Sequence, residues 1–298
     1  METALAQQAM AQQPIVGAAL WAAIQAARRD LPAKMRLIAA FVIDSPTDFI
    51  RMTAREICAR LGTSEPTLIR FCRGFGYTGL ADFRIELALA LADQGSGIAP
   101  LAADRRLANQ AAKRAIARAT VPLLMQDRAV LIDNGSTAEM LAEQLGDDRL
   151  GPMAVMTSGL TVAQNAMRCA RHRVMLTGGL IRPETASMTG RLVETSLAGM
   201  AFDSFVMGAD SIDPEVGLST YAEDEAHITR AMIGAAARVL VVADHTKFRR
   251  ARLHRICGLG RIAALVTDRA PGAEMTAALE AAGVRLVIAD PIPTGATP

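Results

Sequence analysis

The spacing of apolar residues changes from a helical pattern to an alternation of strands and helices partway along the chain. This change limits the fold more than any other feature of the sequence. Residues 31 to about 93 show the apolar spacing of consecutive helices and contain no strand-like run. Between residues 128 and 289, short apolar runs rich in β-branched residues alternate with helical stretches, the runs being 129–132, 154–156, 174–176, 204–207, 239–242, 263–266 and 285–288. These runs are apolar throughout, as strands covered on both faces must be. They predict a parallel or mostly parallel sheet with helices on both faces.

The two patterns predict two domains. An N-terminal tail and an all-α domain occupy 1–93, a linker containing Gly95, Gly97 and Pro100 occupies 94–104, and an α/β domain occupies 105–298. A helix at about 105–125 is expected to lead from the linker into the first strand. With 298 residues, about half of them apolar, both domains can bury a core.

Charge and cysteine usage exclude several classes of protein. The net charge of +2 excludes a global, histone-like attraction to nucleic acid, although it allows a local basic surface. No cysteine pair has the spacing of a disulfide framework or a zinc knuckle, because the four lie far apart at Cys58, Cys72, Cys169 and Cys257. The four histidines do not pair with carboxylates or cysteines at ligand spacing. We therefore expect a cytoplasmic protein with no metal and no cofactor.

The apolar segment 15–27 needs a separate explanation. Glu2 and several glutamines precede it and Arg28 and Arg29 follow it, which is the wrong order for a signal peptide. It is also too short to span a bilayer. We expect a helix that packs on the neighbouring domain or on a second subunit, preceded by a loose tail at residues 1–14, and no contact with a membrane.

A helix-turn-helix pattern lies within the N-terminal domain. Thr53 and Glu56 form a capping box, Gly62 can take a left-handed turn, and Ser64 is placed to cap a second helix with Pro66 in its first turn. On that helix Leu68, Ile69, Phe71 and Cys72 supply the inward side, whereas the residues that share the other face are Thr67, Arg70 and Arg73. Such a second helix lies in the major groove of DNA. A helix–Gly–helix element with an arginine face also occurs in bundles that do not bind DNA.

A resemblance adds to this pattern. The segment from Met52 to Tyr77, with its Ser-x-x-Thr-x-x-Arg-Phe core, and the element from Leu80 to Arg84 resemble the DNA-binding domain of RpiR-type regulators over about residues 31–90. The resemblance implies a dimeric DNA reader that places Ser64, Thr67 and Arg70 on the recognition helix.

Small or polar groups follow five of the predicted strands. The first strand ends in Asp133-Asn134-Gly135-Ser136-Thr137 and opens a helix at about 138–145, whose N-terminal N–H groups suit a phosphate or a carboxylate. The later strand ends are Thr157-Ser158, Thr177-Gly178-Gly179, Gly208-Ala209-Asp210 and Asp244-His245-Thr246-Lys247. In open α/β sheets ligands bind at the carboxyl edge. Each motif alone is more often a cap, a turn or a solvated side chain; their convergence on one edge favours a ligand site.

The order of these motifs resembles the effector domain of DeoR-type regulators over about residues 105–290. The resemblance rests on the strand ends above and on the segments at Asp203, Gly217, Glu225 and Val266. It implies a fold of the ribose-5-phosphate isomerase and CoA-transferase type and a phosphorylated sugar or related metabolite as effector. The effector-binding residues expected from the strand ends and from this resemblance are Asp133, Gly135, Ser136, Thr137, Thr157, Gly178, Gly179, Asp210, Glu225 and Lys247. Thr229 and Arg249 stand where that family commonly has Lys and Gly.

The expected function is therefore a DNA-binding transcriptional regulator, a repressor of carbohydrate-metabolism genes, that binds double-stranded operator DNA as a homodimer or homotetramer. RpiR-type DNA-binding domains usually precede a sugar isomerase (SIS) domain, so a SIS-type sensor is one alternative. A sugar-phosphate isomerase is the other, since Asp133, Asp210 and Lys247 could supply a base and a cation. A fused DNA-binding domain argues against an enzyme. The effector, the operator and the sign of regulation stay open.

Overall fold

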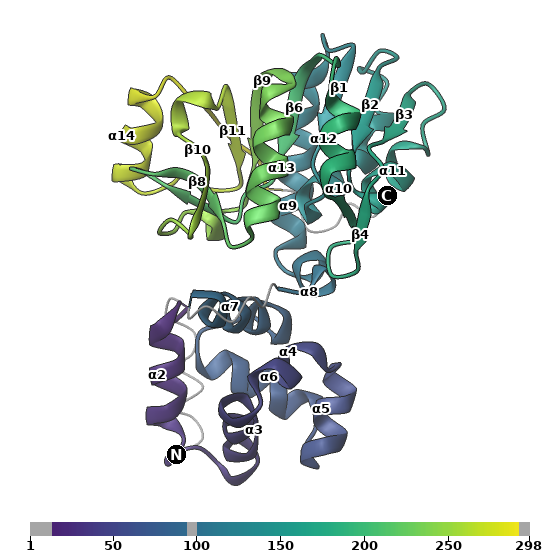
Figure 1. Ribbon diagram of the computed structural model, residues 1–298. Coiled ribbons are helices and arrows are strands. Elements are labelled where there is room, and N and C mark those ends of the chain that lie inside the picture. The colour runs from purple at the N-terminus through teal and green to yellow at the C-terminus, as the bar shows by residue number, and fades with distance from the viewer. Residues whose placement is uncertain (1–13, 94–99, 292–298) are drawn as a thin grey trace. The chain divides into compact units, whose positions relative to one another are not determined.

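The computed structural model describes residues 14–93 and 100–291 (Figure 1). The contacts of the chain divide it into two units, Met1–Ala108 and Asn109–Pro298. The predicted tail lies almost wholly outside the described residues, as does the first part of the predicted linker, 94–99.

The first unit is entirely helical in its described part. Its helices are α2 (Ala18–Ala27), α3 (Ala33–Asp44), α4 (Pro46–Arg51), α5 (Ala54–Leu61), α6 (Glu65–Gly74), α7 (Leu80–Asp93) and α8 (Ala102–Leu107). Phe83 of α7 is fully buried at the centre of the core. Its ring lies edge-on or tilted against four other aromatic rings at centroid distances of 5.4–6.2 Å, those of Tyr77, Phe71, Phe49 and Phe75. Edge-to-face packing of this kind adds to the area that the rings bury.

The apolar segment at residues 15–27 packs inside its own unit. Helix α2 buries Leu20 and Ile24 against α3 and α7. Two bonds hold the segment that leads into it: Glu86 accepts from the Gly17 N–H at 2.8 Å, and the Tyr77 hydroxyl donates to the Ile15 carbonyl. Helix α2 therefore packs on the helices that follow it in the chain, within its own unit, and its packing on a second subunit stays a prediction. A helix this apolar completes the small aromatic core, which the local pattern could not reveal.

The helix-turn-helix element forms as predicted, with one difference. Thr53 and Glu56 make the capping box, and Gly62 takes a left-handed conformation with φ 56°. Lys34 of α3 donates to the Gly62 carbonyl at 2.6 Å. Ser64 occupies the N-cap position of α6, but its hydroxyl bonds the Thr67 hydroxyl at 3.0 Å instead of capping the backbone. The reason is local: Pro66 has no N–H to offer, and the Thr67 N–H already bonds the Ser64 carbonyl.

The helix expected at 105–125 is not continuous. Helix α8 ends at Leu107, Asn109 adopts a left-handed conformation with φ 51°, α9 runs over Gln110–Thr120, and a 3₁₀ turn, η1, follows at Val121–Leu124. Asparagine is one of the few residues that tolerate this backbone conformation. The break falls at the boundary of the two units, and α8 packs on α7 through the buried Arg84–Asp104 ion pair, with 3.5 Å between Nη1 and Oδ1.

The second unit is built on a parallel sheet. In its described part seven strands lie in the order β12-β11-β9-β6-β1-β2-β3 (Figure 1). Their bounds are β1 (Ala129–Ile132), β2 (Ala154–Thr157), β3 (Arg173–Leu176), β6 (Phe202–Met207), β9 (Ala236–Val242), β11 (Ala264–Thr267) and β12 (Arg285–Ile288). Every neighbouring pair is parallel. All seven predicted strands and the predicted sheet class are confirmed.

Helices cover both faces of this sheet. On one face α9, α10 (Ser136–Glu143) and α11 (Leu160–Ala166) pack against Val130 and Ile132. On the other, α12 (Arg191–Leu197), α13 (Glu223–Gly234) and α14 (Ala273–Ala281) pack in one cluster with Leu131. Because successive side chains of β1 point to opposite layers, both must be apolar, which explains the unbroken apolar runs.

Five short strands escaped the sequence pattern. They form a hairpin, β4 (Leu180–Arg182) with β5 (Ser187–Thr189), and an antiparallel group, β7 (Ser211–Asp213), β8 (Gly217–Thr220) and β10 (His254–Cys257). Each has only three or four residues with mixed polar and apolar side chains, so no periodicity could identify it. All four cysteines are free, and no helix among the described residues is long and apolar enough to cross a membrane.

Candidate functional site

The predicted DNA-contacting residues share one surface of α6. Ser64, Arg70 and Arg73 are exposed and Thr67 is half-buried, whereas Leu68, Phe71 and Cys72 face the core. The exposed side chains bond one another: Ser64 to Thr67 at 3.0 Å, and Arg70 Nη2 to Thr67 Oγ1 at 3.4 Å. Arg73 Nε lies 3.5 Å from the Thr78 carbonyl, a contact that holds it toward the loop after α6. The helix therefore presents hydroxyl and guanidinium donors together, as base or phosphate contacts require.

The strand order creates a switch point in the second unit. From β1 the chain moves outward through β2 to β3, then returns to β6 on the other side of β1 and continues through β9, β11 and β12. In open α/β sheets a crevice forms at the carboxyl ends of the two strands where the direction reverses. Here those strands are β1 and β6. The five strand ends singled out by sequence belong to consecutive neighbours, β9, β6, β1, β2 and β3, which lie side by side (Figure 1).

The loop after β1 joins the two sides of the switch point. Asp133 accepts a hydrogen bond from the Gly208 N–H at 3.2 Å, which ties the end of β1 to the end of β6. Burial raises the pKa of Asp133, and the nearby Asp210 adds to this effect, against the lowering by backbone N–H groups and by Arg182. Gly135 is the N-cap of α10, and no side chain caps the first turn. The first N–H groups of that turn therefore lack a side-chain cap at the carboxyl end of β1, and Ser136 and Thr137 are the first two residues of the helix.

Two further predicted residues meet beside this loop. The Thr220 hydroxyl, at the end of β8, lies 2.8 Å from an Asp210 carboxylate oxygen and 3.3 Å from a Glu225 carboxylate oxygen. Asp210 follows β6 and Glu225 lies in the first turn of α13. Both carboxylates are half-buried. Carboxylates grouped around a hydroxyl can accept from the hydroxyl groups of a polyol ligand.

Lys247 lies on a 3₁₀ turn, η3 (His245–Lys247), that follows β9 and opens with Asp244. Burial alone would raise the pKa of Asp244, but Lys247, the Thr246 bonds and Lys113 together hold it below its ordinary value. Asp244 also accepts from Asn109 Nδ2 at 3.3 Å. Asp268, after β11, fixes the turn from the other side by accepting from the His245 backbone N–H at 2.7 Å.

The remaining predicted residues have local structural roles that explain their type. The Thr157 hydroxyl accepts from the Gly159 N–H at 3.0 Å within the turn after β2. Gly179 has φ 131°, and a Cβ there would lie 2.6 Å from the Thr189 carbonyl, so the close approach that requires glycine is made by β5. Gly178, with φ 75°, meets nothing within 4 Å at the Cβ position. Ligand contacts at Thr157, Gly178 and Gly179 stay predictions.

Sequence reasoning missed two cations at this edge. Lys113 of α9 is 3 % exposed, because its spacing from Ile116, Ala117 and Thr120 places it on the buried face of the helix. A lysine at an apolar position of a helical stripe is the signal that could have revealed it. Arg182 of β4 acts electrostatically on Asp133. Nothing in its sequence context marked it, because β4 itself was not predicted.

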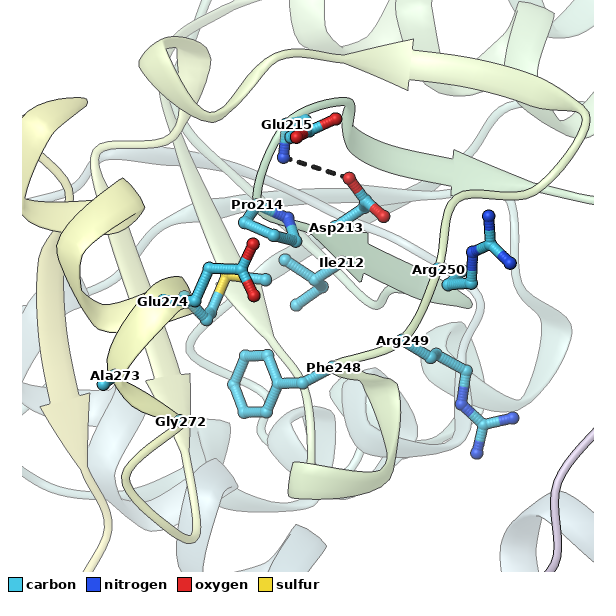
Figure 2. A pocket seen from close by; sticks show the side chains of 11 residues that line it. Ile212, Asp213, Pro214, Glu215, Phe248, Arg249, Arg250, Gly272, Ala273 and Glu274 are labelled. Atoms are coloured by element: carbon cyan, nitrogen blue, oxygen red, sulfur yellow. Dashed lines mark hydrogen bonds between the residues drawn. The ribbon is translucent and has the colours of Figure 1, made fainter.

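None of the predicted effector residues lines a hollow of about 560 Å³ between the loops after β7 and β9 and the start of α14 (Figure 2). Its apolar walls come from Ile212, Phe248 and Met275, and Figure 2 shows the Arg249 and Arg250 side chains directed away from Phe248. The Asp213 carboxylate at its rim stabilises the turn that follows it, because its Oδ1 accepts from the Glu215 and Val216 N–H groups at 3.0 Å. Among the described residues, no group of His, Cys, Asp and Glu side chains has an arrangement that could hold a metal ion.

The first unit has a helix-turn-helix, and the second is an α/β domain with polar residues at the carboxyl edge of its parallel sheet. Together they define a DNA-binding transcription regulator. Residues 108–269 match the family described as the DeoR C-terminal sensor domain, and residues 18–94 match the helix-turn-helix domain of the RpiR family. The chain belongs to the DeoR family by its sensor domain, which is joined to an RpiR-type DNA-binding domain. Both predicted resemblances are confirmed, and a SIS-type sensor is excluded.

Named relatives agree with this class. The chain is 34 % identical over 233 residues to a putative aga operon transcriptional repressor of Escherichia coli O157:H7, covering 78 % of this chain and 86 % of the relative. It is 26 % identical over 168 residues to the glycerol-3-phosphate regulon repressor of Escherichia coli K12, covering 56 % of this chain and 66 % of the relative.

Among solved structures, ribose 5-phosphate isomerase A from Neisseria gonorrhoeae is similar to 47 % of this chain and 54 % of its own, at 16 % identity and a TM-score of 0.34. Agreement this weak carries no argument about function.

Proposed function

We propose that this regulator binds a phosphorylated small metabolite, of the sugar-phosphate type, at the β1–β6 switch point and thereby changes its affinity for operator DNA. The observation that carries the proposal is the first turn of α10, which has no side-chain cap, begins with Ser136 and Thr137 and follows Asp133 at the switch point. A helix N-terminus of this kind stabilises a phosphoryl group through its N–H groups and its dipole.

The rest of the edge suits the remainder of such a ligand. Asp210, Thr220 and Glu225 offer oxygens to sugar hydroxyls. Lys247 adds a positive charge to the partial positive charge at the start of α10. The names of two relatives, repressors of the aga operon and of the glycerol-3-phosphate regulon, support an effector from carbohydrate metabolism. We expect repression and a homodimer or homotetramer that reads an inverted repeat, with half-sites about one helical turn or a multiple apart.

Coupling between ligand and DNA requires that the ligand discriminate between two arrangements of the protein. A single rigid helix from the linker to β1 is not available as the connecting element, because α8 and α9 are separate. The route that the contacts support runs through Asn109, the first residue of the sensor unit, whose side chain donates to Asp244 beside η3. A ligand that engages Lys247 competes for the charge that stabilises Asp244, and so acts on the residue at the unit boundary.

The test introduces a negative charge where the phosphoryl group should lie. Ser136→Asp should abolish the response to effector, by repulsion or by mimicry of the bound state, while the DNA-binding unit stays folded. Ser136→Ala is the matched control: it keeps the backbone N–H groups, so it should still respond, at a higher effector concentration because one hydroxyl donor is lost. The measurement is titration of DNA from the regulated promoter, with and without candidate sugar phosphates, on wild type and both variants. A Ser136→Asp protein that responds like wild type contradicts the proposed site.

Catalysis of sugar-phosphate isomerisation is the competing function. Asp133 and Asp210 lie close enough to affect each other's charge, so a base is available in principle. We propose that the chain is not an enzyme, because turnover gives a fused DNA-binding domain no role. Conversion of pentose or hexose phosphates by the purified protein would overturn this.

A further inference from the structure

Arg182 is placed in an unusual way for its strand. β4 exposes its two apolar residues, Leu180 at 74 % and Ile181 at 50 %, whereas Arg182 is half-buried. The Nε atom of Arg182 is buried and has no hydrogen-bond partner among the described residues. Burying a guanidinium N–H without an acceptor costs free energy. A strand that shields its arginine more than its apolar residues therefore needs an explanation outside the packing of the hairpin.

The hairpin that carries Arg182 is held firmly at the sheet edge. Arg182 pairs across the hairpin with Ser187, which also forms a bridge with Gly159 after β2. The Met188 N–H donates to the Ser158 carbonyl at 2.8 Å. Ser158 in turn lies 3.4 Å from Asn134 Nδ2 in the loop after β1. A continuous set of contacts thus fixes β4 relative to the loop between β1 and α10, which is the proposed phosphate-binding loop.

The guanidinium of Arg182 lies near that loop but forms no ion pair with it. The hairpin contacts place the strand of Arg182 beside the loop that contains Asn134, and Arg182 is close enough to Asp133 to lower the pKa of that carboxyl group. Yet in the described part of the chain Arg182 forms neither an ion pair nor a hydrogen bond with Asp133 or with any other side chain. The guanidinium is therefore held close to the switch point with its donors available.

We infer that Arg182 binds the phosphoryl group of the effector, opposite the N–H groups at the start of α10. This inference rests on the proposed function and adds to it the residue that closes the anion site. A guanidinium offers a planar fork of donors to phosphate oxygens, and the N–H groups and hydroxyls of Gly135–Thr137 approach from the helix side. Donors from two directions match the three terminal oxygens of a phosphoryl group better than the two coplanar oxygens of a carboxylate.

The experiment measures ligand binding to the full-length protein and to three variants, by calorimetry and thermal shift. The probes are inorganic phosphate and ribose 5-phosphate, with ribose as the control that lacks the anion. Arg182→Gln should weaken binding of both phosphorylated probes by about 10-fold to 100-fold, the range of one or two charge-assisted hydrogen bonds. Arg182→Lys keeps the charge but not the fork and should lie between Gln and wild type. Arg191→Gln removes an exposed arginine at the start of α12 and should bind like wild type.

Ligand-free stability separates a binding role from a structural one. If Arg182 serves the ligand, Arg182→Gln should melt at or above the wild-type temperature without ligand, because it removes an unsatisfied buried donor. A lower ligand-free melting temperature combined with unchanged affinity would overturn the inference, as would equal affinity of Arg182→Gln and wild type. If wild type binds neither phosphorylated probe and no other sugar phosphate, the proposed function fails, and this inference fails with it.

Discussion

The two units of this protein build their cores from different residues. Seven of the eleven aromatic side chains lie in the first 108 residues, and six of them form the connected core around Phe83. The sensor unit is nearly twice as long and relies on Val, Leu, Ile, Met and Ala arranged along strands. A small helical domain has little interior, so a few large rings must supply most of the buried area. A larger three-layer domain distributes the same task over many aliphatic side chains.

The functional surfaces differ in the same way. The predicted DNA-contacting residues lie within ten positions of one another on a single helix and bond among themselves. The proposed effector edge draws on five strand ends and on α9, α10 and α13, which span more than 130 residues. The residues of the proposed DNA-contacting surface are thus close together in the sequence. Those of the proposed effector site come together only when the sheet forms.

The largest effect is expected from Phe83→Ala in the aromatic core of the helical unit. Loss of this ring should destabilise the helical unit by about 3–5 kcal/mol, since four aromatic neighbours lose their contact. Thermal unfolding should show one transition moved down and the sensor transition unchanged. Phe205→Ala in β6 is the reciprocal control and should move only the sensor transition. If both transitions fall in either variant, the units do not fold independently and the comparison fails.

A smaller effect is expected from Arg70→Ala on the recognition helix. If Arg70 reads a base, operator affinity should fall by about 1–3 kcal/mol, while binding of effector to the sensor unit stays unchanged. Fluorescence anisotropy with promoter DNA at fixed salt gives the first quantity and calorimetry the second. Arg168→Ala, an exposed arginine of the sensor unit, serves as the control. Unchanged operator affinity would remove Arg70 from the DNA-contacting surface.

The smallest effect tests the link between the regions. Asn109→Gly keeps the left-handed backbone but removes the bond to Asp244, so the ligand-induced change in operator affinity should shrink by about 2-fold to 5-fold, roughly 0.5–1 kcal/mol of coupling. Operator affinity without ligand should not change. Asn109→Asp also tolerates the backbone but places a second carboxylate beside Asp244, and should reduce the coupling further. A full wild-type response in Asn109→Gly would show that coupling takes another route.

Local patterns were sufficient for much of this protein. The capping box at Thr53, the left-handed Gly62 and the seven sheet strands follow from residue type and spacing over a few positions. The same reasoning failed at Ser64, where a proline removed a donor that the cap requires. It also failed at Ala108 and Asn109, which separate two helices where one continuous helix was expected. The short polar strands β4, β5, β7, β8 and β10 carry no period that could be recognised.

By itself the sequence determined the two domain classes, the polar outer face of α6 and the set of strand ends, because each depends on contacts between near neighbours in the chain. Only the tertiary structure decided which strand ends meet, since the reversal between β1 and β6 places Asp133 against Gly208, 75 residues away. It also decided that Lys113 is buried near Asp244 and that Arg182 lies near Asp133. The physical reason is that electrostatics and desolvation depend on distance in space, and distance in space is set by how the sheet is ordered.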